Sequence, residues 1–337
     1  MKYKDIIGQQ HIKEHFQSAV INKTINHAYI INGEKSSGKA MLARTFATAI
    51  MCEAGGSEPC LECEGCKSTI NNCNPDVISL VKDKKKKSDI VGINEIRQQI
   101  IGSIYDRPYN GEHKVYIIDD ADKMNIPAQN AILKTLEEPP EYAVLILLTQ
   151  NVERLLPTII SRCIILNMRP VEDKVIKQYL REKNTLLDSN IDIITAMACG
   201  NVGKAKLISE DENFKEFQES VISILIDVPK TGYRRVLEAV ETLAAIKKAD
   251  IYKPDDIFEL FTLWYRDVLL YKATGEIESL VFKNKATEIA LQADYFRYDA
   301  IEKVIKYVDD ARSKIRSYIS YEATMELLLI NIQEISK

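Results

Sequence analysis

The sequence predicts a doubly wound α/β domain with a phosphate loop, followed by a remainder that is helical throughout. Short apolar segments alternate with amphipathic stretches up to about residue 167, as expected of parallel strands buried on both faces. A Gly-x-x-x-x-Gly-Lys sequence lies between the first of these segments and a helix-like stretch. Beyond Arg169-Pro170 only helical patterns continue. The chain therefore divides into an α/β half and an all-α half.

Five segments are short, nearly continuously apolar and predicted to be the strands. The intervening stretches are long enough for crossover helices, which favours a doubly wound parallel sheet. The predicted strands are Ala28–Asn32, Val77–Val81, Val115–Ile118, Val144–Leu148 and Cys163–Leu166.

Several helices are predicted after the last strand. Three short ones, Glu172–Glu182, Ser189–Cys199 and Val202–Ser209, read as a small bundle, and Tyr321–Ile335 is strongly apolar. Trp264 lies on the apolar face of another helix, so we expect it in the core.

Length and composition describe an ordinary globular protein. The 337 residues suit two or three domains, and 46% hydrophobic with 28% charged residues is typical of soluble chains. The formal charge of −4 argues against a protein that coats nucleic acid indiscriminately. We find neither a signal-peptide pattern nor an apolar run of ~18 residues, so we expect a cytoplasmic protein with no membrane partner. There, the seven cysteines are expected to be thiols or metal ligands.

The phosphate loop comprises Gly33 to Lys39. In such loops, backbone N–H groups surround a phosphate and the lysine, here Lys39, reaches its outer oxygens, while glycines such as Gly33 and Gly38 permit the tight path. Ala40 occupies the position where a Ser or Thr hydroxyl would bind Mg²⁺. The sequence therefore predicts a nucleotide-binding loop that lacks one metal ligand.

Two acids follow the third predicted strand. In phosphate-loop ATPases the first acid holds Mg²⁺ and a glutamate after it polarises the attacking water. Asp119 can fill the first role, but Asp120 is one methylene shorter than glutamate. A strand ending in two acids is common by itself; the phosphate loop ~80 residues upstream favours a nucleotide site.

A cysteine cluster lies between the phosphate-loop helix and the second strand. Cys60, Cys63 and Cys66 are spaced so that they can converge on one ion, with Cys52 favoured over Cys73 as the fourth ligand. The alternative is a set of free thiols, which such regular spacing disfavours. We predict a structural Zn²⁺ site, and because four thiolates leave no open position, no catalysis is assigned to it.

Arg162 lies in the sequence Ser161-Arg162-Cys163, just before the last strand. A lone arginine is usually solvated or paired at the surface. At the mouth of an α/β sheet it can instead neutralise the γ-phosphate of a nucleotide bound to a neighbouring subunit. The residues leave both alternatives open.

These features together resemble a known family. The chain resembles the bacterial DNA polymerase III clamp loader, an assembly of AAA+ subunits. The resemblance rests on residues 130–140 (NAILKTLEEPP), on Ser161-Arg162-Cys163 and on the cysteine insert. The resemblance is strongest over Met1–Arg169 and looser across the helical remainder. It implies an AAA+ α/β module over 1–168 with a zinc insert at 52–73, a helical lid over 169–210 and a helical collar over 211–337.

The resemblance also implies roles for single residues. Arg162 would be an arginine finger offered in trans to the ATP site of the adjacent motor subunit. Thr149, just after the fourth predicted strand, lies at the family's first sensor position.

Three positions depart from the pattern of the family's motor subunits. Ala40 replaces the metal-binding hydroxyl, Asp120 the catalytic glutamate and Gly203 the sensing arginine of the lid. Lys204 is adjacent to Gly203 but on a different helix face, so it is not a substitute. A chain that lacks these three ATPase residues and keeps the finger arginine resembles the family's delta-prime subunit.

Partners and cofactors follow from the same resemblance. It implies a pentameric ring with the motor (gamma/tau) and clamp-opening (delta) subunits, which loads the sliding clamp on primed DNA within the DNA polymerase III holoenzyme, a nucleotidyltransferase as an assembly. The chain would contain structural Zn²⁺ and lack its own ATPase, with ATP/Mg²⁺ binding left open. The alternatives are an ATP-hydrolysing motor subunit of the same loader and another AAA+ remodeller, such as a helicase loader.

A basic run, Lys84–Lys87, follows the second strand. Such a run in a loop is most often a solvated turn. The alternative is an electrostatic contact with the DNA backbone, which salt would weaken.

Overall fold

The computed structural model describes residues 1–80, 90–183, 188–248 and 252–335 and divides the chain into two compact units. The first unit is Met1–Val171 together with Asn201–Gly203, and the second is Glu172–Gly200 with Lys204–Lys337. The separation of a lid at 169–210 from a collar at 211–337 stays a prediction. The run Lys84–Lys87 lies outside the described residues.

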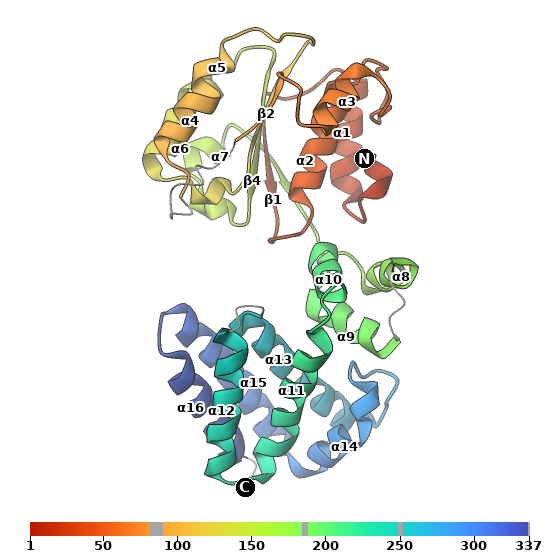
Figure 1. The fold of residues 1–337 in the computed structure, drawn as a ribbon, viewed down its shortest axis with the longest axis vertical. Coiled ribbons are helices and arrows are strands. Elements are labelled where there is room, and N and C mark those ends of the chain that lie inside the picture. The colour runs from red at the N-terminus through yellow and green to blue at the C-terminus, as the bar shows by residue number, and fades with distance from the viewer. Residues whose placement is uncertain (81–89, 184–187, 249–251, 336–337) are drawn as a thin grey trace. The chain divides into compact units, whose positions relative to one another are not determined.

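The first unit is built on a five-stranded parallel sheet with the order β2-β3-β4-β1-β5 (Figure 1). All five predicted strands are present, and the first has the predicted bounds. Small differences at the other strand ends are within the usual uncertainty of element limits, and Val81, the last residue of the predicted second strand, lies outside the described residues. The strands are β1 (Ala28–Asn32), β2 (Val77–Ser79), β3 (Lys114–Ile118), β4 (Ala143–Thr149) and β5 (Ile164–Asn167).

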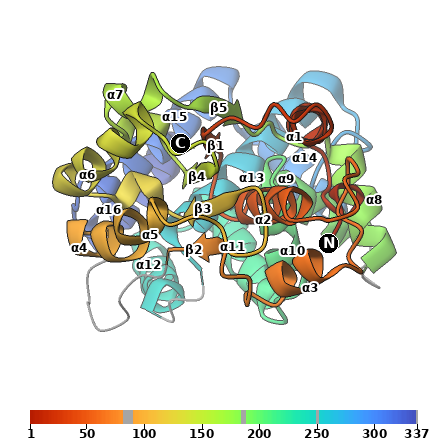
Figure 2. The same cartoon turned by 90° about the horizontal axis from the view of Figure 1, so that it is seen from above.

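Helices cover both faces of this sheet, as a doubly wound fold requires (Figures 1 and 2). Successive strand residues point to opposite faces, so Ile30 and Ile31 of β1 belong to the two separate hydrophobic cores on either side of the sheet. One face carries α1 (Gln10–Ile21) and α2 (Lys39–Ile50); the other carries α4 (Ile93–Ile96), a π-helical segment (Arg97–Ile101), α5 (Gly102–Ile104), α6 (Ile126–Glu137) and α7 (Pro157–Ile160). A further helix, α3 (Glu64–Ile70), lies in the cysteine insert, and 3₁₀ turns occur at Tyr3–Asp5, Ala121–Lys123 and Val152–Arg154.

In the described part of the second unit, every regular element is a helix. Trp264 is fully buried, as predicted, and its Nε1 donates to Gln292 Oε1 at 2.9 Å while Gln292 Nε2 donates to Leu225 O at 2.8 Å. The predicted helix Tyr321–Ile335 has the same bounds in the structure. The helices are α8 (Asp173–Lys183), α9 (Asp188–Ala198), α10 (Val202–Ser209, whose first two residues belong to the first unit), α11 (Phe214–Asp227), α12 (Tyr233–Lys248), α13 (Pro254–Thr274), α14 (Ala286–Tyr295), α15 (Tyr298–Arg316) and α16 (Tyr321–Ile335), with 3₁₀ turns at Val228–Lys230 and Lys283–Lys285.

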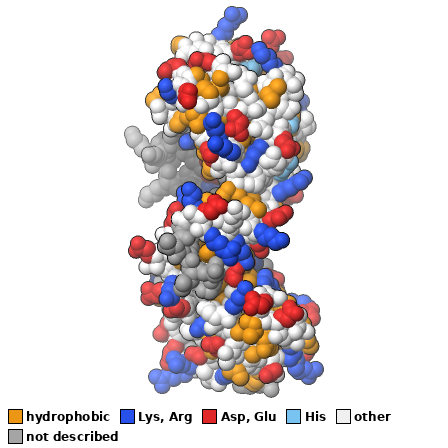
Figure 3. Space-filling view, turned by 90° about the vertical axis from the view of Figure 1, so that its right-hand side faces the viewer, with side chains coloured by type: hydrophobic (Ala, Val, Ile, Leu, Met, Phe, Trp, Pro, Cys, Tyr) orange, Lys and Arg blue, Asp and Glu red, His pale blue; other side chains and the backbone are white. Residues whose placement is uncertain are grey.

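The surface carries charges of both signs. Basic and acidic side chains are interspersed over the face drawn in Figure 3, with smaller apolar areas between them. Within the described ranges, no helix is both long enough and apolar enough to span a membrane.

Candidate functional site

The phosphate loop connects β1 to α2 in the first unit. Ser36 and Gly38 have positive φ angles of 62° and 97°, and Gly38 is the N-cap of α2. A positive φ is readily adopted by glycine, so Gly38 is required by the path of the chain. Gly33 N donates to Thr149 O at 3.1 Å, which joins the start of the loop to the end of β4.

Lys39 is directed at the loop itself. Its Nζ donates to Gly33 O at 2.8 Å and to Glu34 O at 2.7 Å. Burial of the side chain lowers the pKa of Lys39, and the carboxylates of Asp119 and nearby acids oppose this shift. Two of the three N–H bonds of the ammonium group are thus engaged by carbonyls of the loop itself.

The hydroxyl of Ser37 is also bonded within the first unit. Its Oγ donates to Glu34 O at 2.7 Å and lies 3.2 Å from Met168 Sδ. The neighbouring Ala40 carries only a methyl group and cannot bind a metal ion. Ala40 therefore offers Mg²⁺ no ligand, and the hydroxyl hydrogen of Ser37 is directed at an acceptor within the first unit.

Residues Asn201–Gly203 pack on the outside of the phosphate loop, within the first unit. Asn201 Nδ2 donates to Lys35 O at 2.8 Å and lies 3.3 Å from Glu34 Oε2. A Cβ atom at Gly203 would lie 1.9 Å from Ser36 O, a backbone atom. Any side chain at position 203, including the arginine expected of a motor subunit, would require this backbone to move.

The acids after β3 and the threonine at the end of β4 lie at the carboxyl edge of the sheet, beside the phosphate loop. Asp120 has a left-handed backbone (φ 49°) and its carboxylate pairs with Lys123 at 3.0 Å. Thr149 is fully buried, and its Oγ1 donates to Asp122 Oδ1 at 3.2 Å. The structure thus brings Gly33, Gly38, Lys39, Asp119, Asp120 and Thr149 to one edge of the sheet.

Asp122 is a residue of this edge that the sequence analysis missed. Its Oδ1 accepts hydrogen bonds from Thr149 Oγ1 and, at 3.1 Å, from Gln150 N. The carboxylate thereby holds the end of β4 against the turn after β3. In the sequence, the signal for Asp122 is its position three residues after Asp119, in the turn that follows the same strand.

Four cysteines converge in the insert. The Sγ atoms of Cys52, Cys60, Cys63 and Cys66 all lie within 4.8 Å of one another, and those of Cys60 and Cys66 are 3.9 Å apart. Thiolates bound tetrahedrally to zinc at about 2.3 Å are about 3.8 Å apart. The cluster therefore has the ligand type and spacing that zinc needs.

Local hydrogen bonds prepare one of these thiols for a cation. The N–H groups of Cys63 and Glu62 donate to Cys60 Sγ at 3.4 Å and lower the pKa of Cys60 to about 6. Burial raises the pKa of Cys66. Cys73 is exposed, lies outside the cluster, and its Sγ is 3.3 Å from Asn71 O.

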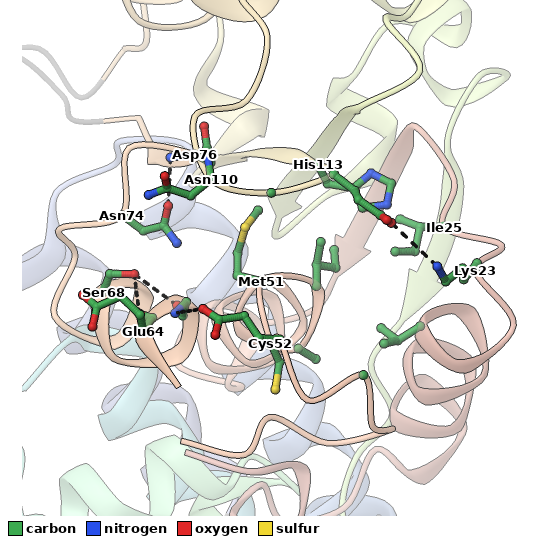
Figure 4. A pocket seen from close by; sticks show the side chains of 18 residues that line it. Lys23, Ile25, Met51, Cys52, Glu64, Ser68, Asn74, Asp76, Asn110 and His113 are labelled. Atoms are coloured by element: carbon green, nitrogen blue, oxygen red, sulfur yellow. Dashed lines mark hydrogen bonds and ion pairs between the residues drawn. The ribbon is translucent and has the colours of Figure 1, made fainter. Parts of the chain in front are cut away.

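A cavity of about 630 Å³ lies beside the cysteine insert (Figure 4). The fully buried Asp76 accepts hydrogen bonds there from the N–H groups of Tyr109 and Asn110 at 2.9–3.0 Å. Lys23 and Glu112 form an exposed ion pair of 3.9 Å across the rim. These contacts order the loop before β3, and we assign the cavity no ligand.

Arg162 lies at the other edge of the sheet. It follows α7 and precedes β5, whose Ile164 is in register with Tyr29 near the start of β1. The phosphate loop leaves the opposite end of β1, a strand of five residues that spans about 15 Å. Arg162 and the chain's own phosphate loop are therefore separated by the length of the sheet.

Arg162 borders a second cavity of about 630 Å³, together with His27, Glu137, Glu138 and Cys163. Arg162 pairs with Glu137 at the end of α6. Burial raises the pKa of Cys163 to about 12, so this thiol stays protonated beside the arginine.

Comparison with known proteins gives a consistent assignment. The family model described as "DNA polymerase III, delta subunit" matches residues 8–172. The delta' subunit of Bacillus subtilis DNA polymerase III is 27% identical over 327 residues, covering 97% of this chain and 96% of that protein. The tau subunit of the same organism is 30% identical over 331 residues, covering 90% of this chain; the chain spans only 57% of tau.

Among solved structures, a gamma subunit-related protein of Thermotoga maritima aligns with 96% of this chain and 99% of its own, with 19% identity and a TM-score of 0.44. The sequence relatives, the match to residues 8–172 and the five-stranded parallel sheet with its phosphate loop agree. The chain belongs to the clamp-loader AAA+ family of DNA polymerase III.

Proposed function

We propose that this chain is a delta-prime-type, non-motor subunit of a cytoplasmic DNA polymerase III clamp loader. It completes the ring with motor (gamma/tau) and clamp-opening (delta) subunits, and the ring loads the sliding clamp on primed DNA. Its own contribution to the ATP cycle is Arg162, which acts on the nucleotide of the neighbouring motor subunit.

The position of Arg162 is the observation that carries this proposal. The side chain lies at the amino-terminal edge of β1 and β5, whereas the chain's own phosphate loop lies at the carboxyl edge. An arginine separated from its own loop by the length of β1 can reach a γ-phosphate only if another subunit supplies it.

The state of the chain's own loop supports a non-motor role. Lys39 is bonded to loop carbonyls, Ala40 offers no metal ligand and Asp120 is paired with Lys123. At Gly203, the sensing arginine of a motor subunit has no room. Thr149, at the first sensor position, donates its hydroxyl to Asp122 and serves to brace the edge of the sheet.

The same proposal includes structural zinc on Cys52, Cys60, Cys63 and Cys66. A bound zinc ion would cross-link the insert through its thiolates. The N–H groups that donate to Cys60 Sγ favour its thiolate form. The exposed Cys73 takes no part.

Steady-state ATP hydrolysis tests the proposal. The isolated chain, with primed DNA and clamp, is expected to show no turnover that depends on Lys39. In the assembled loader, Arg162→Ala is expected to slow hydrolysis by up to roughly 10³–10⁵ at the affected site, and by less overall because other sites still turn over. Turnover by the isolated chain that disappears in Lys39→Ala would contradict the non-motor role, and unchanged hydrolysis by the Arg162→Ala loader would contradict the finger.

A motor subunit of the same loader is the second candidate. It is favoured by the intact Gly33, Gly38 and Lys39 and by relatives named tau and gamma. Co-purification separates the two: a non-motor subunit joins a ring that already contains a separate motor subunit, whereas a motor subunit forms the ring without one.

A further inference from the structure

The guanidinium group of Arg162 is bound by its own subunit. Nη1 donates to Thr158 O at 3.0 Å and to Ser161 Oγ at 3.2 Å, and Nη2 lies 3.0 Å from Glu137 Oε1. The three acceptors thus engage three of the five N–H bonds of the guanidinium group, two on Nη1 and one on Nη2. Of the three, only Glu137 carries a charge.

Glu137 sits where a helix disfavours it. It is the last residue of α6, and a carboxylate at a helix C-terminus faces the negative end of the helix dipole. Glu138 follows directly, so two acids lie at this end. Arg162 offsets the charge of Glu137, and the ion pair restrains the arginine.

We propose that Glu137 holds Arg162 in an inactive position, defined by its contacts with Thr158, Ser161 and Glu137 and here called the parked position. The nucleotide phosphate of a neighbouring subunit must displace Glu137 from the arginine. This inference rests on the proposed trans role of Arg162. Glu137 is a positioning residue: it acts on the finger and does not touch the reacting phosphate.

The exposure of the pair makes the exchange feasible. The side chains of Arg162 and Glu137 are 36% and 50% exposed, and ion pairs this open to water contribute little to stability. A γ-phosphate carries more negative charge than a carboxylate and can accept two parallel hydrogen bonds from a guanidinium, so it can compete with the single contact to Glu137 Oε1. The finger can therefore exchange its carboxylate for a phosphate, but its engagement is reduced by the fraction of time for which Glu137 holds it.

The test uses the fully assembled loader with the variant Glu137→Gln, which keeps the size of the side chain and removes its charge. Release of the finger is expected to raise kcat/KM for ATP two- to fivefold, equivalent to about 0.4–1 kcal/mol at 1.36 kcal/mol per factor of ten. Glu138→Gln is the matched control, because it removes the same charge one residue away and from the same cavity. It is expected to leave kcat/KM within a factor of about 1.5.

The double variant Glu137→Gln/Arg162→Ala makes the test specific. The gain from Glu137→Gln is expected to vanish in the absence of Arg162, because the two residues act as one unit. If the ion pair were merely structural, its loss in Glu137→Gln would lower the thermal midpoint of the isolated chain and leave kcat/KM unchanged.

The possible failures are distinguishable. If Arg162→Ala slows the loader while Glu137→Gln lowers kcat/KM or leaves it unchanged, the parked position is wrong and the trans finger stands. A rise that Glu138→Gln reproduces, or that persists without Arg162, also overturns the parked position. If Arg162→Ala has no effect, the proposed function fails first.

Discussion

Replacement of single cysteines in the insert gives a direct test of the zinc site. The distance of 3.9 Å between the Sγ atoms of Cys60 and Cys66 corresponds to an ion-to-sulfur distance of about 2.4 Å in a tetrahedral site, within 0.2 Å of the usual zinc value. We expect one zinc ion per chain in the unaltered protein. Cys63→Ser removes one of four thiolates and is expected to reduce the zinc content to well below half an ion per chain.

Cys73→Ser is the matched control. Cys73 belongs to the same insert, but its exposed thiol lies outside the cluster. The variant is therefore expected to keep one zinc ion per chain. Cys52→Ser should behave like Cys63→Ser, because the Sγ of Cys52 lies within 4.8 Å of the other three.

The effect on stability is expected to be local. Between Cys52 and Cys73 few apolar side chains are buried, so the insert has little core of its own. Structural zinc contributes up to about 10–16 kcal/mol in isolated zinc fingers, enough to fold such a segment. On loss of zinc, α3 should exchange its amide hydrogens rapidly while β1 and β4 stay protected, because their core is made of strands and helices outside the insert.

The assay is the release of metal to a colorimetric chelator after denaturation, combined with hydrogen exchange on the native chain. A Cys63→Ser protein that keeps one zinc ion per chain would refute the four-thiolate site. So would loss of zinc in Cys73→Ser, because the fourth ligand would then be the residue that the geometry leaves out.

Two further predictions concern stability. Gly203→Ala would place a Cβ 1.9 Å from the phosphate-loop backbone and is expected to lower the free energy of unfolding by about 1–3 kcal/mol. Gly232→Ala is the control, because the space around Gly232 is open, and it should lower the free energy of unfolding by less. Equal effects of the two variants in denaturant titrations would contradict the close contact at Gly203. Burial raises the pKa of the Asp267 carboxyl group, so the folded state binds a proton at this group more tightly than the unfolded state does. The protonated carboxyl group therefore contributes to stability at low pH. This contribution is lost as the pH rises from the unfolded pKa of 3.8 through the raised folded pKa. Asp267→Asn is expected to remove that loss, so pH profiles of stability that run parallel in the two proteins would contradict it.

The sequence predicts those parts of the site that depend on local order. Continuous apolar segments place the strands, because strands buried on both faces cannot alternate with polar residues. The spacing of Cys60, Cys63 and Cys66 indicates their convergence, because a short turn brings such thiols to one side. Gly38 likewise indicates a tight turn in the loop, because glycine readily adopts the positive φ found there.

Contacts between distant segments could not be predicted in this way. Glu137 and Arg162 are far apart in sequence, and their pairing depends on how α6 and α7 pack on the sheet. The pattern of NAILKTLEEPP marks the glutamate without indicating its partner. The contact between Gly203 and Ser36 similarly depends on where α10 begins relative to the loop, so the sequence indicates a missing arginine but not its steric reason.

The departures of the phosphate loop from a motor subunit are physically connected. Because Gly203 lies against the Ser36 backbone, an arginine cannot return at 203 unless the loop moves. Because Lys39 is bonded to Gly33 O and Glu34 O, restoring a hydroxyl at Ala40 alone would leave the ammonium group engaged. On the proposed non-motor role, nucleotide chemistry would thus return only with coordinated changes in the loop, in the acid after β3 and at the start of α10. Arg162 takes part in none of these contacts, since it lies at the opposite edge of the sheet, so its proposed action on a neighbouring nucleotide does not depend on the state of the chain's own loop.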